Sequence, residues 1–427
     1  MPLPTRQRVG PLPAAIPEQP PHTRRLALWL GSLGTSLCAD QVFFLALTWA
    51  AIQVGTPGQV GVVVAAASLP RLVLLLLGGT LADRVNPRVL AAVSDAGRAV
   101  AVAAAVAVVL TVDLRIWQLV VVAVAVGALD GLFMPAIGAL PASIAPPHLL
   151  GRVGALRAVA QRVALLLAGP ISGALIAWAG IAAGLATAAA LFLVSVTLLL
   201  LLPTGAAATD AAADPAGTVE PEPAPTSFSA DLAAGLRVVR RNAVLPWLLL
   251  LIAALNLGFA GPVTAGLPLL AAEQHWGASG AGFLLGAFGI GAAATGLTLI
   301  FVRGLPRNGV VLLVAFAVQG LAIGAFAFAP GLLGALVDAL LLGLGSGVVS
   351  SIVYGMLHTA TPPAALGRVM ALVSIALEAT FPVSNYLTGV VVQVRGSDLA
   401  FLVGGGLLVV AAVAAATRPA IRDFRRL

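Results

Sequence analysis

The feature that most restricts the fold of this sequence is a series of twelve apolar stretches, each long enough to cross a membrane. A membrane-spanning helix needs about 20 mostly apolar residues. Such stretches cover residues 26–54, 59–81, 89–112, 117–140, 154–178, 181–202, 244–270, 280–302, 309–329, 332–357, 369–394 and 399–416. Short Gly- and Pro-containing separators, such as GTPG at 55–58, divide them. We therefore expect an all-α membrane protein with twelve transmembrane helices.

Composition excludes several classes of protein. Only 9% of the residues are charged and 60% are apolar, against about 25% charged residues in an average soluble domain. This excludes a soluble enzyme, a disordered scaffold and a nucleic-acid binder. All basic residues are arginines, so a P-loop, which needs a lysine, is absent and an ATP-driven pump is excluded.

Cysteine and histidine are too scarce for most site chemistry. The chain has one cysteine, Cys38, and four histidines scattered along the sequence. We therefore expect no disulfide, no metal site and no cofactor. An intramembrane hydrolase would need a nucleophile with a base, and no Cys or His has suitable partners in the sequence. The chain is not expected to be an enzyme.

The arginines predict the orientation in the membrane. Arginines gather in one set of loops and in the C-terminal tail, whereas the opposite loops hold only Arg115 and Arg395. Cytoplasmic loops carry the excess of positive charge. We therefore expect both termini on the cytoplasmic side of the plasma (inner) membrane of the cell.

The chain divides into two groups of six spans. We expect a disordered tail at 1–25, a first six-helix bundle at 26–202 and a second one at 244–416, followed by a basic tail at 417–427. Between the bundles lies a cytoplasmic linker at 203–243, which is rich in Ala, Pro and acids in its first part. In its second part, 228–241, apolar residues recur at helical spacing opposite three arginines, which predicts an amphipathic helix on the membrane surface.

The two groups of spans repeat each other. PPHLLGRVGAL at 146–156 matches PPAALGRVMAL at 362–372 at eight of eleven positions, with an offset of 216 residues. The same offset relates Gly127 to Gly343, and Gly173 to Gly389. Two six-span repeats related by an axis along the membrane normal form one large class of transporter.

Three motifs resemble the major facilitator superfamily. The segment GTLADRVNPR at 79–88 is similar to its G-x-L-A-D-R-x-G-R-R/K loop, with Asn86 and Pro87 as departures. GPISGA at 169–174 resembles the G-P-x-x-G-G antiporter motif of drug exporters, and FSADLAAGLR at 228–237 resembles the branch of macrolide-type and siderophore exporters. An arginine that many proton-coupled drug exporters carry early in the fourth span is absent here.

These motifs assign two groups of residues. The resemblance implies a gating loop of Gly79, Asp83, Arg84 and Arg88, and an antiporter-like motif of Gly169, Pro170 and Gly173. An acid such as Asp83 is favoured beside a helix N-terminus, where it would latch one conformation. A proline flanked by glycines kinks a membrane helix and permits close packing; ordinary packing of small residues is the alternative for this motif.

Ionisable residues near the middle of the spans are the candidate site, because a charge at the bilayer centre costs about 2.5–3.5 kcal/mol. They are Asp40, Arg71, Asp130, Arg162 and Glu378. The repeat adds Asn256, which corresponds to Asp40, and it aligns Arg162 with Glu378, which we expect to pair in one conformation. Three acids against two arginines leave one negative charge, so one acid, Asp40 first, should exchange a proton. A satisfied structural network is the alternative.

Two further expectations concern the surroundings of this site. Asp95 and Arg98, three residues apart on one helix face, are expected to form a structural pair. Aromatic residues are expected to line the cavity with many small ones: Phe43, Phe44, Trp49, Trp247, Phe259, Phe381 and Tyr386.

The leading hypothesis is therefore a monomeric secondary active transporter. It would export a hydrophobic or amphipathic small molecule, such as a drug, an antibiotic or a siderophore, and this substrate could carry a positive charge. Export would occur in exchange for protons or sodium ions. Metabolite uptake by symport and a non-transporting lipid scramblase or assembly factor are the alternatives. Its partners would be the substrate, the coupling ion and the lipid bilayer, with no nucleic acid.

Overall fold

The computed structural model describes residues 22–82, 85–145, 150–203, 228–301 and 308–424. Within these ranges, eleven helices are long and apolar enough to cross a membrane. The helices of the first half are α1 (His22–Val54), α2 (Pro57–Ala82), α3 (Pro87–Thr111), α4 (Ile116–Ile144) and α5 (Leu150–Leu200). Those of the second half are α8 (Leu245–Gly261), α9 (Leu267–Glu273), α10 (Gly277–Phe301), α11 (Asn308–Ala325), α12 (Gly331–Ala360), α13 (Leu366–Arg395), α14 (Ser397–Ala416) and α15 (Pro419–Arg422).

Shorter elements complete the chain. A π-helix, η2 (Pro262–Gly266), joins α8 to α9, so that these three elements form one candidate span. Two 3-10 turns, η3 (Phe326–Phe328) and η4 (Pro363–Ala365), precede α12 and α13. The helix α7 (Phe228–Arg241) leads into the second half.

Twelve membrane-spanning helices are expected, and eleven candidate spans are found among the described residues. The difference lies at α5, in which the chain reverses its direction. Ser172 donates a hydrogen bond to the Val42 carbonyl oxygen (3.3 Å), and the hydroxyl oxygen of Ser195 lies 3.0 Å from the Ser32 carbonyl oxygen. A straight helix would separate its residues 172 and 195 by about 34 Å, but residues 32 and 42 of α1 are only about 15 Å apart. The reversal lies at Gly180, whose φ of 81° and ψ of 176° are not helical.

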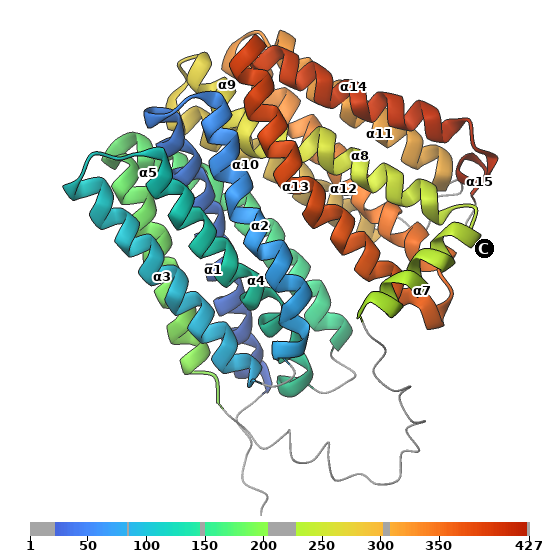
Figure 1. Ribbon diagram of the computed structural model, residues 1–427, viewed down its shortest axis with the longest axis horizontal. Coiled ribbons are helices and arrows are strands. Elements are labelled where there is room, and N and C mark those ends of the chain that lie inside the picture. Colours follow the sequence, from blue (N-terminus) through green and yellow to red (C-terminus); the bar gives the residue numbers. More distant parts are fainter. Residues whose placement is uncertain (1–21, 83–84, 146–149, 204–227, 302–307, 425–427) are drawn as a thin grey trace, which may run out of the picture.

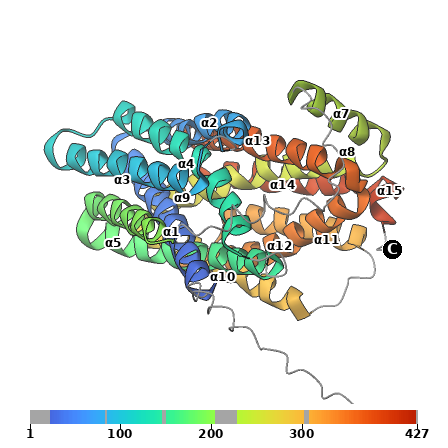
Figure 2. The same cartoon turned by 90° about the horizontal axis from the view of Figure 1, so that it is seen from below.

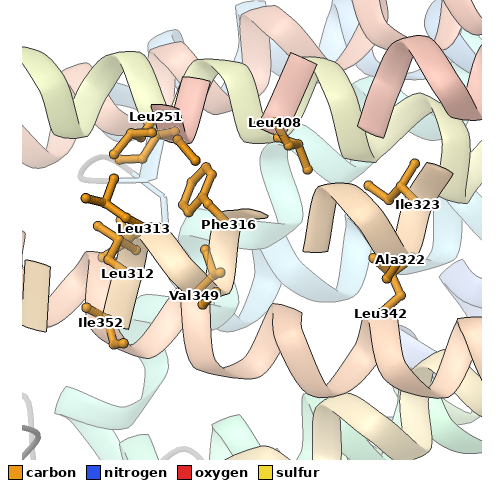
Figure 3. Packing of buried hydrophobic residues seen from close by; sticks show 14 of the residues in the cluster. Leu251, Leu312, Leu313, Phe316, Ala322, Ile323, Leu342, Val349, Ile352 and Leu408 are labelled. Carbon is orange, nitrogen blue, oxygen red and sulfur yellow. The ribbon is translucent and has the colours of Figure 1, made fainter. Parts of the chain in front are cut away.

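The two halves form two helical bundles that lie side by side (Figure 1). In the second half, Leu251 of α8, Phe316 of α11, Val349 of α12 and Leu408 of α14 pack into one apolar core (Figure 3). In the first half, the cores join α1 to α2, α3, α4 and α5, and Phe43 is fully buried in one of them. Each bundle therefore buries apolar side chains of its own, which is what a two-part fold requires.

The sequence repeat is visible in the packing within each half. A Cβ on Gly127 of α4 would collide with the carbonyl oxygen of Ala67 in α2, and a Cβ on Gly343 of α12 would collide with that of Phe288 in α10. The two glycines are 216 residues apart. Small residues let membrane helices approach closely, so the repeat preserves the same helix pair in both halves.

Two helix pairs hold the halves together. The helix α5 packs against α10, and α2 packs against α13. At the end of α13, Gln393 accepts hydrogen bonds from the backbone nitrogen of Gly58 (3.0 Å) and from the Thr56 hydroxyl (3.1 Å). In Figure 1 the bundles meet at the end where α2 begins and α13 ends, which is opposite to the end where α7 lies.

The helix α7 uses its apolar side for protein contacts. Gly235 packs against the backbone of Arg368 in α13, and Val239 is 3% exposed. Arg237, Arg240 and Arg241 are exposed. Figure 2 shows α7 at the margin of the molecule beside α13. Val239 of the apolar stripe thus packs against protein, whereas Leu236 is 39% exposed; the location of α7 on the membrane surface stays a prediction.

Candidate functional site: the central cavity and its charged network

A cavity of about 310 Å³ lies between the two halves. Five of the six polar residues expected at the site line it: Asp40, Arg71, Asp130, Asn256 and Glu378. Most other wall positions are apolar, among them Phe44, Val64, Val126, Leu285, Leu377 and Phe381. A mostly apolar pocket with a few convergent polar groups is typical of small-molecule sites.

Arg98 of α3 is the hub of the charges beside this cavity. Its guanidinium donates hydrogen bonds to Asp40 (2.9 Å), to Asp130 (3.2 Å) and to Asp95. It also lies over the rings of Phe133 and Phe192, with Cζ 4.3 and 4.7 Å from the ring centroids. The side chain is completely buried. Because a buried charge is stable only when paired and hydrogen-bonded, this arginine holds α1, α3 and α4 together.

Hydroxyl groups fix the Asp95 carboxylate behind Arg98. The Ser36 hydroxyl donates to one oxygen at 3.1 Å, and the Ser195 hydroxyl donates to the other at 2.5 Å. Ser195 is also hydrogen-bonded to Ser32 (2.9 Å). Asp95 is fully buried, so it orients Arg98 without contacting the cavity.

Arg71 of α2 is held much more loosely than Arg98. Its Nε lies 3.2 Å from an Asp130 oxygen and 3.6 Å from a Glu378 oxygen. The Arg71 side chain is 31% exposed, and its Nε makes no hydrogen bond within the described part of the chain. Since α2 belongs to the first half and α13 to the second, Arg71 and Glu378 form an ion pair across the cavity.

These ion pairs join six groups into one network with excess acid. Asp40, Asp95, Asp130 and Glu378 supply four carboxylates, and Arg71 and Arg98 supply two guanidinium groups. If all six are ionised, the network carries two uncompensated negative charges. Uncompensated charge in a low-dielectric site is costly, so the network is suited to taking up protons or another cation.

The second half lines the cavity with neutral polar groups next to Glu378. Asn256 of α8 donates to the carbonyl oxygen of Leu377 and to the hydroxyl of Thr380 (2.9 Å). Thr264, in the π-helix η2, donates to the side-chain oxygen of Asn385 at 2.5 Å. These bonds fix α13 against α8 and thereby set the position of the Glu378 carboxylate.

Several residues expected at the cavity lie elsewhere in this structure. Arg162 does not line it. Glu378 faces Arg71 instead, so the pairing of Arg162 with Glu378 stays a prediction for another conformation. Of the expected aromatic residues, only Phe44 and Phe381 line the cavity. The others pack in the cores or lie at the surface: Phe43, Trp49, Trp247 and Phe259 are core contacts, and Tyr386 is 48% exposed.

The two motifs fall on different parts of the molecule. In the expected gating loop, Asp83 and Arg84 lie outside the described residues, as does the side-chain environment of Gly79. Arg88 donates hydrogen bonds to the carbonyl oxygens of Leu199 (2.7 Å) and Leu200 (2.6 Å) at the end of α5. It thus satisfies terminal carbonyls that a helix leaves unpaired.

The antiporter-like motif lies at a contact between the halves. A Cβ on Gly169 would be 3.0 Å from the carbonyl oxygen of Gly282 in α10, and a Cβ on Gly173 would be 2.9 Å from the Cα of Gly282. Pro170 faces Gly286 of the same helix. The small residues of this motif therefore permit α5 and α10 to touch.

The family of the chain follows from comparison with known proteins. The family model for the Major Facilitator Superfamily matches residues 28–340, which is more than half of the chain and includes the cavity-lining residues of both halves except those of α13. The chain belongs to the major facilitator superfamily.

Relatives and solved structures agree with this membership. The enterobactin exporter EntS of Shigella boydii is 31% identical over 252 residues, which cover 58% of this chain and 56% of that exporter. The aligned part thus spans little more than half of the relative. The nucleoside transporter NupG (TM-score 0.70, 14% identity) covers 92% of this chain and 98% of its own. A D-xylose-proton symporter (TM-score 0.66, 14% identity) covers 94% and 98%. These two structures share the fold.

The sequence predicted Arg98 and Asp95 only as a structural pair beside the site and did not predict their part in the charged network. Their spacing of three residues indicated a pair on one helix face, and the pair is present. The additional contacts of Arg98 with Asp40 and Asp130 come from two other helices. The signal available in the sequence was the position of this pair inside a membrane span, where ionisable groups are rare and mark functional sites.

Proposed function

We propose that the chain is a secondary active transporter that exports an amphipathic or hydrophobic small molecule across the inner membrane in exchange for protons. It acts by alternating access, with twelve membrane crossings, both termini and the linker in the cytoplasm, and a single chain as the working unit. The observation that carries this proposal is the acid-rich network, which lines a largely apolar cavity between two halves that meet through small residues.

The carboxylates supply the coupling in this proposal. Asp40 and Glu378 both reach the cavity, whereas Asp95 is sealed behind Arg98. A proton on Asp40 or Glu378 would cancel part of the excess negative charge. Release of that proton on one side of the membrane, and uptake on the other, would tie the state of the network to the proton gradient. Asp130, which is shared between Arg71 and Arg98, is the next candidate.

Two observations favour export. The Gly-Pro segment that resembles an antiporter motif lies at the contact between α5 and α10. The enterobactin exporter that this chain resembles is by its name an exporter of a siderophore. A siderophore-like molecule is accordingly one substrate to test. The D-xylose-proton symporter shows that the same fold also serves uptake, so direction must be measured.

The experiment is a survival test followed by a proton assay. Expression in an efflux-deficient bacterial host should raise tolerance to at least one compound of a drug and siderophore panel, and Asp40→Asn should abolish that gain. Adding the active compound to the detergent-solubilised protein between pH 5 and pH 9 should then release protons. Release that persists in both Asp40→Asn and Glu378→Gln would refute these carriers. Compound accumulation inside the cell would refute export, and dependence on sodium alone would refute proton coupling.

A further inference from the structure

The two arginines of the network differ in how they are held, and this difference bears on the substrate. Arg98 is fully buried, has hydrogen bonds to three carboxylates and lies over two aromatic rings. Arg71 is 31% exposed, and its Nε lies 3.2 Å from Asp130 and 3.6 Å from Glu378; within the described residues the Nε atoms of both arginines lack a hydrogen bond, so the two differ in the number of their other contacts. Charge-assisted hydrogen bonds of good geometry are the strong ones, and Arg98 has more of them than Arg71. Arg98 is therefore a fixed part of the protein, whereas Arg71 is displaceable.

We propose that Arg71 occupies the place of a cationic group of the substrate, so that the exported molecule is an amphipathic cation that displaces Arg71 from Glu378 and Asp130. This inference rests on the proposed function and specifies its substrate class. Both carboxylates line the cavity, and apolar side chains such as Phe44, Phe381 and Leu285 line the same space. A molecule with one positive charge and an apolar body matches both surfaces.

The charge balance supports a cation over a neutral or anionic substrate. The network has two negative charges more than it has positive ones when fully ionised. A proton and a monovalent cation would each remove one of them, and both would compete for the same carboxylates. Binding of the cation would therefore favour release of the proton, which is the requirement for exchange of the two. An anion would add to the excess instead.

Displacement of Arg71 would also separate the halves. The Arg71–Glu378 contact joins α2 of the first half to α13 of the second half. A substrate cation that takes over Glu378 frees α2 from this contact. The same event would thus bind the substrate and release one link between the halves.

A matched pair of ions tests the inference. Tetraphenylphosphonium and tetraphenylborate have nearly the same size and apolar surface but opposite charges. Their equilibrium binding is measured to the purified full-length protein in detergent. We expect the phosphonium ion to bind at least about tenfold more tightly than the borate ion. Equal affinity, or tighter binding of the borate ion, would overturn the inference.

Variants then separate the two arginines. Arg71→Gln should tighten phosphonium binding about two- to fivefold, because a loosely held competitor is removed, and Arg71→Lys should leave it near the original value. Glu378→Gln should weaken it about tenfold. Arg395→Gln is the control, because Arg395 is exposed at the end of α13, does not line the cavity and should change nothing. Weaker phosphonium binding in Arg71→Gln, with the folded protein confirmed by gel filtration, would show that Arg71 is part of the site and not a competitor.

Proton release during the same titrations distinguishes this inference from the proposed function. Selective phosphonium binding without proton release would retain the cation site and refute proton exchange. Proton release by neutral or anionic compounds, with no preference for the phosphonium ion, would retain proton exchange and refute the cation site.

Discussion

Gly173 of α5 and Gly389 of α13 occupy equivalent positions in the two halves, and each faces a glycine of the opposite half. A Cβ on Gly173 would be 2.9 Å from the Cα of Gly282, and one on Gly389 would be 2.8 Å from the Cα of Gly61. Because the two glycines are also related by the sequence repeat, the two contacts between the halves have the same construction. Both contacts lie toward the end of the molecule that is opposite to α7 (Figure 1).

Gly389→Val should therefore force the halves apart at this end. The added side chain would meet the backbone of α2, which cannot move aside within its bundle. A cysteine at Ser68 in the cavity wall, introduced with Cys38→Ser, should then react faster with an impermeant thiol reagent applied to intact cells. Gly406→Val is the control, because nothing lies within 4 Å of the Cβ position of Gly406. Equal labelling rates in the two variants would show that this contact does not control access.

The next prediction concerns Arg98, whose removal leaves three carboxylates without their common partner. Breaking a buried ion pair by removing one partner costs about 3–5 kcal/mol, because an uncompensated charge stays behind. Arg98→Leu should therefore lower the thermal unfolding temperature of the detergent-solubilised protein strongly. The double variant with Asp95→Leu should recover part of the loss, since it removes one of the stranded charges. Arg162→Leu should have little effect, and a comparable loss in that variant would contradict the assignment of Arg98 as the hub.

Arg88 should stabilise the end of α5. Its two hydrogen bonds satisfy terminal carbonyl oxygens, and its charge complements the negative end of the helix dipole. Hydrogen bonds to charged groups contribute about 1.5–3 kcal/mol. The bond to Leu199 is part-buried and the bond to Leu200 is exposed, so the first should contribute more, and Arg88→Ala should raise hydrogen–deuterium exchange in the last turn of α5. Arg88→Lys retains the charge without the forked geometry and should give an intermediate effect. Unchanged exchange in Arg88→Ala would show that the cap is dispensable.

The sequence predicted the helices of this protein better than the directions in which they face. Hydrophobic length and loop glycines locate most spans, and the repeat correctly pairs Gly127 with Gly343 and Gly173 with Gly389. In spans that are apolar all round, however, no periodicity separates the cavity side from the lipid side. That is why Tyr386, which is 48% exposed, and Phe43, which is fully buried, could not be distinguished from the cavity-lining Phe44.

The charged network was predictable in its members but not in its connections. Rarity alone marks an ionisable group in the membrane as a candidate, and five of the six expected polar residues do line the cavity. Partners depend on helix rotation and depth, which spacing along one helix does not give. The repeat favoured Arg162 as the partner of Glu378 in one conformation, whereas this structure joins Glu378 to Arg71, and Arg98 to Asp40 and Asp130.

The orientation in the membrane is the last prediction, and it rests on the arginine distribution alone. A cysteine at Ala211, in a protein whose Cys38 is replaced by Ser, should react with an impermeant thiol reagent only after the cells are opened, because the linker is expected in the cytoplasm. A cysteine at Asp113, an exposed residue in the loop between α3 and α4, is the matched control and should react in intact cells. The positive-inside rule gives these two positions opposite sides. Labelling of the Ala211 cysteine in intact cells, or protection of the Asp113 cysteine, would reverse the topology and with it the direction assigned to transport.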